Sequence, residues 1–410
     1  MTGENGLPKG WVETTLKDIV NYTIDNRGRN PEYYTDTGIP VIDNFMIKGD
    51  RDVDLNLTKR FIDENLYETF IRKYLKPKDV IITLVGNGYG NVSIAPNFKS
   101  VIIQNTVGLR ANSNGDNYFI FYNLSYRKKR LTDLNRGAAQ PSIKVGDLMQ
   151  VKINLPPIQE QKAIASILTS FDDKIELLQA QNETLETIAQ TIFKEWFGKY
   201  QVGDELPEGW RVGILGDVAT HSKVSVRPFE NPKVEYFHFS LPAYDDGLKP
   251  IVERGEMIKS NKYIVETNAF LVSKLNPFTP RIWTIFNSQD NFICSTEFQV
   301  VKPKSEKYFS LIHCLLNSDR FTNKLSQKIK GTSSSHQRVN PQDIFDVELV
   351  IPNDTDLNTF DSIVFPLVKK KDINKIQIQT LQATRDTLLP KLMSGQLRVT
   401  EFQEQLCEVM

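Results

Sequence analysis

The sequence predicts an α+β protein in which two globular domains are separated by a long antiparallel two-helix coiled coil, with an internal pseudo-two-fold repeat. Three observations lead to this prediction. The chain repeats its flanking segments, each repeat ends in a helical heptad pattern, and the segments between contain short strand-like runs punctuated by Gly, Asn and Pro. At 410 residues the chain is long enough for two or three domains.

The repeat is visible first in a short tryptophan motif. Residues 7–11 read Leu-Pro-Lys-Gly-Trp, and residues 206–210 read Leu-Pro-Glu-Gly-Trp, 199 residues later. The later parts of the two halves align without a gap at an offset of 196 residues, which places Ile143 on Val339. We therefore expect two related halves. A gene duplication that kept no functional symmetry is the alternative interpretation.

Composition favours a soluble globular protein. Apolar residues make up 40% and charged residues 24% of the chain, and no uncharged apolar run reaches the roughly 18 residues that a membrane span needs. The N-terminus lacks the basic and then apolar layout of a signal peptide, so a cytoplasmic protein is expected. Basic and acidic residues number 50 each, which excludes a uniformly basic coat and makes the local distribution of charge informative.

Cysteine and histidine give no sign of a metal site or a disulfide framework. The three cysteines are far apart and have no CxxC spacing. The four histidines show no metal-ligand spacing either. We therefore predict no metal site and no disulfide.

The first globular domain is expected at residues 1–157. A strand-like run at residues 80–84 leads into residues 85–91, Val-Gly-Asn-Gly-Tyr-Gly-Asn, where three glycines in five residues would let the backbone approach a ligand closely. The Asn and Tyr side chains of this loop could reach base edges or phosphates. A nucleotide-binding loop is the alternative, but no Walker lysine follows and the spacing does not fit a dinucleotide fingerprint.

A basic element precedes the first long helix. Residues 127–130 read Arg-Lys-Lys-Arg and lead to residues 136–144, a Gly-containing loop with two cations. Cations, amides and hydroxyls on such a loop suit contacts to phosphates and bases. A basic surface that only faces solvent is the alternative.

A helical spacer is expected at residues 158–198. Residues 158–197 contain neither proline nor glycine, and apolar residues recur at alternating steps of three and four, as in a coiled-coil seam. Such a helix spans about 60 Å, and its acid-rich surface should repel DNA. Asn182 falls in the seam, where it either fixes the register or stays solvated at the seam edge.

The second globular domain is expected at residues 199–352 and repeats the layout with different residues. A strand-like run leads into residues 273–281, where Lys274 and Arg281 supply charge. A second basic stretch ends in residues 331–338, Gly-Thr-Ser-Ser-Ser-His-Gln-Arg. The same composition at the same place in both halves of a neutral protein favours nucleic-acid contact over a merely solvated surface.

Residues 353–410 are expected to form a C-terminal helix and tail. This helix and the first one each have a narrow apolar stripe that neither can bury alone, so the two should pack together. The first helix leads from the first domain to the second, and the second helix therefore has to run back. The pair is expected to be antiparallel, with the two halves related by a pseudo-two-fold axis.

The candidate nucleic-acid contacts are the polar and basic side chains of the loops in both halves. They are Asn87, Tyr89, Asn91, Arg127, Lys128, Lys129, Arg136, Gln140, Ser142, Lys144, Lys274, Asn276, Arg281, Lys328, Lys330, Ser334, Ser335, His336, Gln337 and Arg338.

Several segments resemble conserved regions of the specificity subunits of type I restriction-modification enzymes. They are residues 7–11 with their copy at 206–210, residues 155–161 (Leu-Pro-Pro-Ile-Gln-Glu-Gln) and residues 389–395 (Leu-Pro-Lys-Leu-Met-Ser-Gly). The resemblance covers the whole chain. Residues 352–357, Pro-Asn-Asp-Thr-Asp-Leu, depart from the Pro-Pro-x-x-Glu-Gln that is usual in the family.

The resemblance implies two target-recognition domains that each read one half of a split DNA site. In the family, conserved helices set the gap between the halves and two modification subunits dock on the helical region. The resemblance also implies adenine methylation from S-adenosylmethionine by the modification subunits and ATP-driven cleavage by restriction subunits. S-adenosylmethionine, ATP and Mg²⁺ are therefore expected on partner subunits, and no cofactor on this chain.

No catalytic residue is assigned to this chain. It has no Asn/Asp-Pro-Pro-aromatic tetrapeptide for amino methylation and no P-loop. We therefore expect a non-catalytic subunit of a DNA methyltransferase and site-specific deoxyribonuclease complex. The alternatives are a coiled-coil protein scaffold with two globular binding domains, and an enzyme with a hidden active site, for which motifs are lacking.

Overall fold

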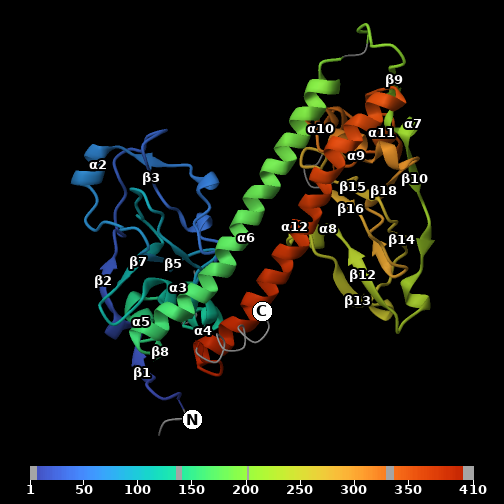
Figure 1. Ribbon diagram of the computed structural model, residues 1–410. Coiled ribbons are helices and arrows are strands. Elements are labelled where there is room, and N and C mark those ends of the chain that lie inside the picture. The colour runs from blue at the N-terminus through green and yellow to red at the C-terminus, as the bar shows by residue number, and fades with distance from the viewer. Residues whose placement is uncertain (1–6, 135–140, 201–202, 329–336, 400–410) are drawn as a thin grey trace. The chain divides into compact units, whose positions relative to one another are not determined.

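A computed structural model describes residues 7–134, 141–200, 203–328 and 337–399 (Figure 1). Within those ranges no helix combines the length and apolar character that a membrane span requires. The chain divides into two compact units. Unit 1 consists of Met1–Leu177 and Ile378–Met410, and unit 2 consists of Leu178–Gln377.

Unit 1 is built on an antiparallel four-stranded sheet whose two central strands are largely buried. The strand order is β2 (Val20–Ile24), β7 (Thr106–Ala111), β5 (Val80–Thr83) and β6 (Val92–Ile94). Helix α3 (Asn117–Tyr126) packs on this sheet. A separate pair, β1 (Val12–Thr15) with β8 (Lys152–Leu155), joins the N-terminal segment to the strand before the first long helix.

Short elements complete unit 1. They are α1 (Leu16–Ile19), β3 (Ile39–Pro40), η1 (Asn44–Met46), η2 (Leu55–Leu57), β4 (Phe61–Ile62), α2 (Glu64–Thr69), α4 (Lys128–Thr132) and α5 (Val145–Met149). The main apolar cluster joins sheet residues such as Ile82 to Leu168 of the first long helix and Leu392 of the second. The domain core is therefore continuous with both helix segments of its own unit.

The described residues of unit 2 form two larger sheets and one two-stranded pair. The first has the order β10 (Ala219–Ser222), β18 (Phe298–Pro303), β15 (Ala269–Ser273) and β16 (Ile282–Ile285). The second has the order β11 (Ser225–Val226), β14 (Lys262–Ile264), β17 (Phe292–Cys294), β12 (Glu235–Phe239) and β13 (Ile251–Arg254). As in unit 1, a separate pair, here β9 (Arg211–Ile214) with β19 (Glu348–Ile351), leads into the long helix that follows.

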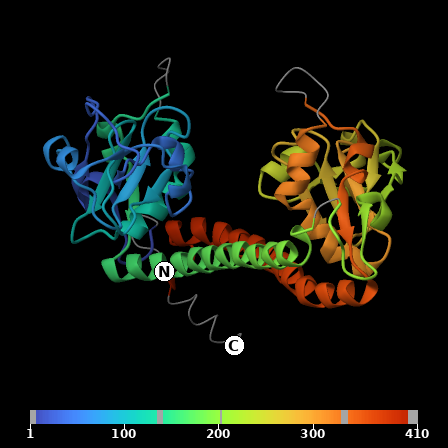
Figure 2. The ribbon, with the colours of Figure 1, turned by 90° about the horizontal axis from the view of Figure 1, so that it is seen from above.

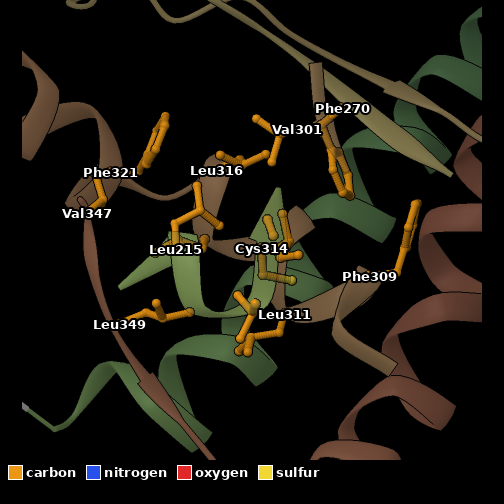
Figure 3. Packing of buried hydrophobic residues seen from close by; sticks show 14 of the residues in the cluster. Leu215, Phe270, Val301, Phe309, Leu311, Cys314, Leu316, Phe321, Val347 and Leu349 are labelled. Atoms are coloured by element: carbon orange, nitrogen blue, oxygen red, sulfur yellow. The ribbon is translucent and has the colours of Figure 1, made fainter. Parts of the chain in front are cut away.

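The helices of unit 2 lie around these sheets. They are α7 (Leu215–Val218), η4 (Pro228–Glu230), α8 (Leu241–Asp245), η5 (Gly255–Met257), η6 (Glu306–Tyr308), α9 (Phe309–Leu316), α10 (Asp319–Ser326) and α11 (Pro341–Phe345). Every residue of α9 is buried. Figure 3 shows its residues Leu311 and Cys314 in the cluster that also holds Leu215. Helix α9 is therefore a core helix enclosed on all sides.

Two long helices extend through both units. Helix α6 (Ile158–Phe193) ends in the π turn η3 (Lys194–Gly198), and α12 (Asp354–Ser394) is the second helix. The heptad pattern predicts a continuous helix to Phe197, whereas the last turn is wound as a π turn. Figure 2 shows that each globular domain lies on the segments of α6 and α12 that belong to its own unit.

The two helices are antiparallel within each unit, as predicted. In unit 2, Asn182 pairs with Asn374 and Glu186 pairs with Lys371, so the residue numbers rise on α6 while they fall on α12. Asn374 is fully buried, and its amide donates to Asn182 at 3.0 Å. Asn182 is therefore buried in the seam rather than solvated at its edge, in the position of a residue that fixes register.

A tryptophan contact repeats in both units. The indole Nε1 of Trp11 donates to Glu160 at 3.1 Å, and that of Trp210 donates to Asp356 at 2.7 Å. Glu160 and Asp356 are 196 residues apart, the offset found in the sequence. Although residues 352–357 depart from the family motif, Asp356 still supplies the carboxylate that accepts the indole hydrogen bond. The internal repeat therefore extends to side-chain contacts.

Candidate nucleic-acid interface

In unit 1 the glycine-rich loop after β5 is joined to the segment before α5. The backbone N–H of Ile143 donates to the carbonyl of Leu84 at 2.8 Å, and Val85 forms a β-bridge with Ser142. The N–H of Gly86 also donates to the carbonyl of Pro141 at 3.4 Å. The two loops that the sequence singled out in this half therefore form one surface, which we call loop pair 1 (residues 84–91 and 141–144).

Unit 2 repeats the arrangement at the equivalent place. The N–H of Val339 donates to the carbonyl of Lys274 at 3.1 Å, and Leu275 forms a β-bridge with Arg338. The N–H of Asn276 donates to the carbonyl of Gln337 at 3.0 Å. We call this surface loop pair 2 (residues 273–281 and 337–338). Each loop pair joins the loop after a central strand to the segment before the short helix that precedes the spacer.

Glycine is required in loop pair 1 by both conformation and space. Gly88 and Gly90 have φ values of +83° and +82°, which L side chains rarely adopt. A Cβ atom at Gly90 would lie 3.2 Å from Thr132 of α4. The loop therefore lies directly against the basic helix α4, so two of the predicted elements are brought together.

Exposed cations lie on and beside loop pair 1, and unit 2 has an exposed lysine after α10. Lys128 and Lys129 on α4 and Lys144 in loop pair 1 are exposed, and so is Lys328 just after α10. Arg127 differs from these residues, because it is half-buried and its Nε donates to Asn123 at 2.9 Å. Burial and the nearby Arg130 lower the pKa of its guanidinium.

Other polar candidates of loop pair 1 are divided between surface and interior. Asn87 is exposed, and Tyr89 is half-buried against the apolar core. Asn91 is only 8% exposed, and its amide donates to the carbonyl of Ile47 at 2.9 Å. Its side chain holds the loop in place, which differs from the direct base contact that the sequence suggested for it.

In loop pair 2 two arginines are held by carboxylates. Arg281 makes a bidentate ion pair with Asp245, at 2.7 and 2.9 Å, and its side chain is 17% exposed. The guanidinium of Arg281 lowers the pKa of Asp245. Arg338 pairs with Glu297 at 3.0 Å, but 55% of its side chain remains exposed. Lys274, Asn276 and Gln337 are half-buried.

The acidic partners could not be predicted from the sequence. Asp245 comes from α8 and Glu297 from the turn before β18, and neither shows a local motif that links it to an arginine far away in the chain. Asn44, whose amide donates to the carbonyl of Asn87 at 3.4 Å, was missed for the same reason. All of these contacts depend on the tertiary structure.

Six candidates lie outside the described residues. They are Arg136, Gln140, Lys330, Ser334, Ser335 and His336. In the part of the chain that the structure does describe, no group of three or more His, Cys, Asp or Glu side chains could hold a metal ion.

Comparison with known proteins defines the class. The model of the type I restriction modification DNA specificity domain matches residues 8–187 and again residues 207–383. The chain therefore belongs to this family, and both of its halves match the same domain.

Individual relatives support the assignment. The type I restriction enzyme MjaIX specificity subunit of Methanocaldococcus jannaschii is 28% identical over 96% of this chain and 87% of its own length. The putative MjaX specificity subunit of the same organism is 39% identical over 31% of this chain and 30% of its own length. The crystal structure of a type I restriction-modification S subunit from M. genitalium is similar in fold, with a TM-score of 0.64, 17% identity and coverage of 96% of this chain and 99% of that one.

Proposed function

We propose that this chain is the sequence-specific DNA-recognition subunit of a type I restriction-modification complex and that each globular domain reads one half of a bipartite target. The observation that carries the proposal is the loop pair. The same backbone arrangement occurs once in each half, includes at least one exposed cation in each half, and carries different side chains in the two halves. Equivalent frames with different side chains suit two half-sites of different sequence.

The cations and the polar loop residues have separate roles in this proposal. Lys128 and Lys129 contact phosphates, which contributes affinity without sequence information. The polar loop residues either contact base edges or hold in place the side chains that do. They are Asn87 and Tyr89 in unit 1, and Asn276 and Arg281 in unit 2. Arg281 suits the positioning role better, because Asp245 holds its guanidinium and its Nη1 is buried.

The catalytic steps belong to partner subunits in this proposal. Two modification subunits, docked on the helical region, methylate adenine from S-adenosylmethionine, and restriction subunits use ATP and Mg²⁺ to cleave DNA. This chain contributes recognition and no catalytic residue. The specificity-subunit names of the relatives support this division of roles.

The test begins by identifying the target. Mapping methylated adenines across the host genome should reveal a split motif. A duplex with that motif is then titrated with the complex of this chain and its modification subunits, and the affinity should fall steeply as the salt concentration rises. Scrambling either half of the motif should weaken binding.

Three results would contradict the proposal. The first is a contiguous motif, and the second is affinity that does not change when one half is scrambled. The third is methylation by the isolated chain, which would place catalysis here. Tight binding to an unrelated protein in the absence of DNA would instead favour a scaffold.

A further inference from the structure

A chain of polar contacts links loop pair 2 to both spacer helices of unit 2. Thr284 lies on β16, the strand that begins directly after loop residue Arg281. Its hydroxyl lies 3.3 Å from Nδ1 of His313 on α9, and Nε2 of the same ring lies 3.3 Å from a carboxylate oxygen of Glu186 on α6. That oxygen also accepts from Nζ of Lys371 on α12 at 2.5 Å. We call His313, Glu186 and Lys371 relay 2.

Unit 1 contains a matching set built from different residues. The hydroxyl of Tyr122 on α3 donates to Asp172 on α6 at 2.5 Å. The other oxygen of Asp172 accepts from Arg385 on α12 at 2.5 Å. We call Tyr122, Asp172 and Arg385 relay 1. In both relays a carboxylate on α6 stands between a donor from the globular domain and a cation from α12.

Relay 1 is also close to its loop pair. Asn91 at the end of the glycine-rich loop is bonded to the carbonyl of Ile47, and Ser93 on β6 donates to the carbonyl of Asp50 at 2.8 Å. The next residue, Arg51, forms ion pairs with Asp173 and with Glu176 on α6. The residue beside Asp172 is thereby tied to the segment that supports loop pair 1.

The relay groups are buried enough for their geometry to matter. His313 is 3% exposed, and the side chains of Asp172 and Glu186 are 6% and 23% exposed. Leaving a buried charge without its partner strongly destabilises the fold. These bonds therefore favour one orientation of the globular domain on the helices over other orientations that bury a similar apolar area. Apolar packing alone is less directional.

We infer that relays 1 and 2 are positioning devices, each of which fixes the angle of its recognition loops on the spacer helices and thereby sets how strictly the complex measures the gap between the two half-sites. This inference rests on the proposed function. None of the six side chains is proposed to contact DNA. They act through the loops and helices that they join.

The test measures gap selectivity in the complex with the modification subunits. The probes are duplexes that carry the mapped target with its native gap and with gaps one base pair shorter and longer. The wild-type complex should prefer the native gap. Glu186→Gln and Tyr122→Phe should each lower that preference about fivefold, the factor expected from losing roughly one buried hydrogen bond. The discrimination within each half-site should not change.

Matched variants distinguish a loss of positioning from a general loss of stability. Glu183→Gln removes a charge from an exposed position on the same helix and should leave gap selectivity unchanged. Lys371→Arg keeps the cation and should retain most of the selectivity. Tyr122→Phe keeps the ring in the core, so it still reports on gap selectivity if Glu186→Gln folds poorly.

The outcomes distinguish this inference from the proposed function. Equal weakening on all three gaps, or selectivity that stays at the wild-type level in both Glu186→Gln and Tyr122→Phe, would overturn the positioning role while leaving bipartite recognition intact. A wild-type complex that does not distinguish the target from scrambled DNA would overturn both.

Discussion

Unit 1 and unit 2 share the frame around the long helices but differ in the side chains that line the loop pairs and face the spacer. Both have a tryptophan bonded to a carboxylate at the start of a long helix, an antiparallel helix pair and a loop pair. The loop of unit 1 depends on glycines with positive φ, whereas that of unit 2 contains prolines and arginine–carboxylate pairs. The contacts that build the frame are therefore retained, and the surfaces that would read a sequence are free to vary.

The largest effect is expected from the aromatic core of unit 2. Phe360 is fully buried, and its ring centroid lies 4.9 Å from that of Phe197 and 5.8 Å from that of Trp196. Phe360→Ala should lower the free energy of unfolding by about 3–5 kcal/mol, because it leaves a cavity. Hydrogen exchange should show lost protection in unit 2 with little change in unit 1. Equal loss in both would mean that the units unfold as one.

The next effect concerns the carboxylate-held arginine of loop pair 2. Arg281→Ala should reduce discrimination at one half-site only, by about 1–3 kcal/mol. If Arg281 acts by holding the loop, Asp245→Ala should reduce discrimination at the same half-site by a similar amount. The measurement is the affinity for duplexes that carry single base substitutions in each half of the target. A loss confined to Arg281→Ala would instead assign base contact to the guanidinium.

Lowering the pH should change the stability of the two units in opposite directions. Burial lowers the pKa of His313, so below about pH 6.5 the unfolded chain takes up this proton before the folded one, and unit 2 loses up to about 1.4 kcal/mol per pH unit. Burial raises the pKa of Glu186, but the hydrogen bond from His313 and the charge of Lys371 outweigh it and lower that pKa. Unit 2 therefore loses further stability as the pH falls below the ordinary pKa of a glutamate.

Unit 1 should respond in the opposite direction. Burial and the Asp52 carboxylate raise the pKa of Glu176 to about 7, so the folded state takes up that proton first and is stabilised as the pH falls from 7 toward 5. The gain is smaller than the loss in unit 2, because 39% of the Glu176 side chain is exposed. Hydrogen exchange at the two pH values, corrected for intrinsic rates, measures both trends. Glu176→Gln should remove the response of unit 1.

The smallest effect is expected from the exposed lysines of α4. Replacing Lys128 and Lys129 by Ala should weaken DNA binding on all sequences alike and reduce the slope of log affinity against log salt by about one for each lost phosphate contact. Titrations at several salt concentrations measure that slope. A change in sequence preference without a change in slope would mean that these lysines read bases.

The frame could be predicted from the sequence because its signals are periodic and local. The heptad spacing in residues 158–197 predicted α6, and connectivity predicted that α12 runs back along it. Asn182 was recognised as a seam position because its spacing is helical. Proline is a weaker guide, since α12 continues through Pro366. Tertiary packing holds this helix together where local preference would interrupt it.

The site could be predicted only in outline. Recurrence of basic loops at equivalent places indicated the separate loops of both halves, but neither their pairing nor which side chains point inward. Asn91 looks like any other polar residue of a glycine-rich loop, and its amide is buried only because Ile47 offers a carbonyl there. His313 lies in an apolar helix, and nothing in its neighbours indicates Glu186 as its partner. Such pairings depend on the folded chain.

The bond between Trp11 and Glu160 also has a spectroscopic consequence. Of the four tryptophans, Trp11 alone belongs to unit 1, and Trp196, Trp210 and Trp283 belong to unit 2. A chain with phenylalanine at the three positions of unit 2 would keep a single buried indole whose N–H is bonded to a carboxylate. The emission wavelength of that indole would report the opening of the junction between the N-terminal segment and α6 independently of events in the second unit.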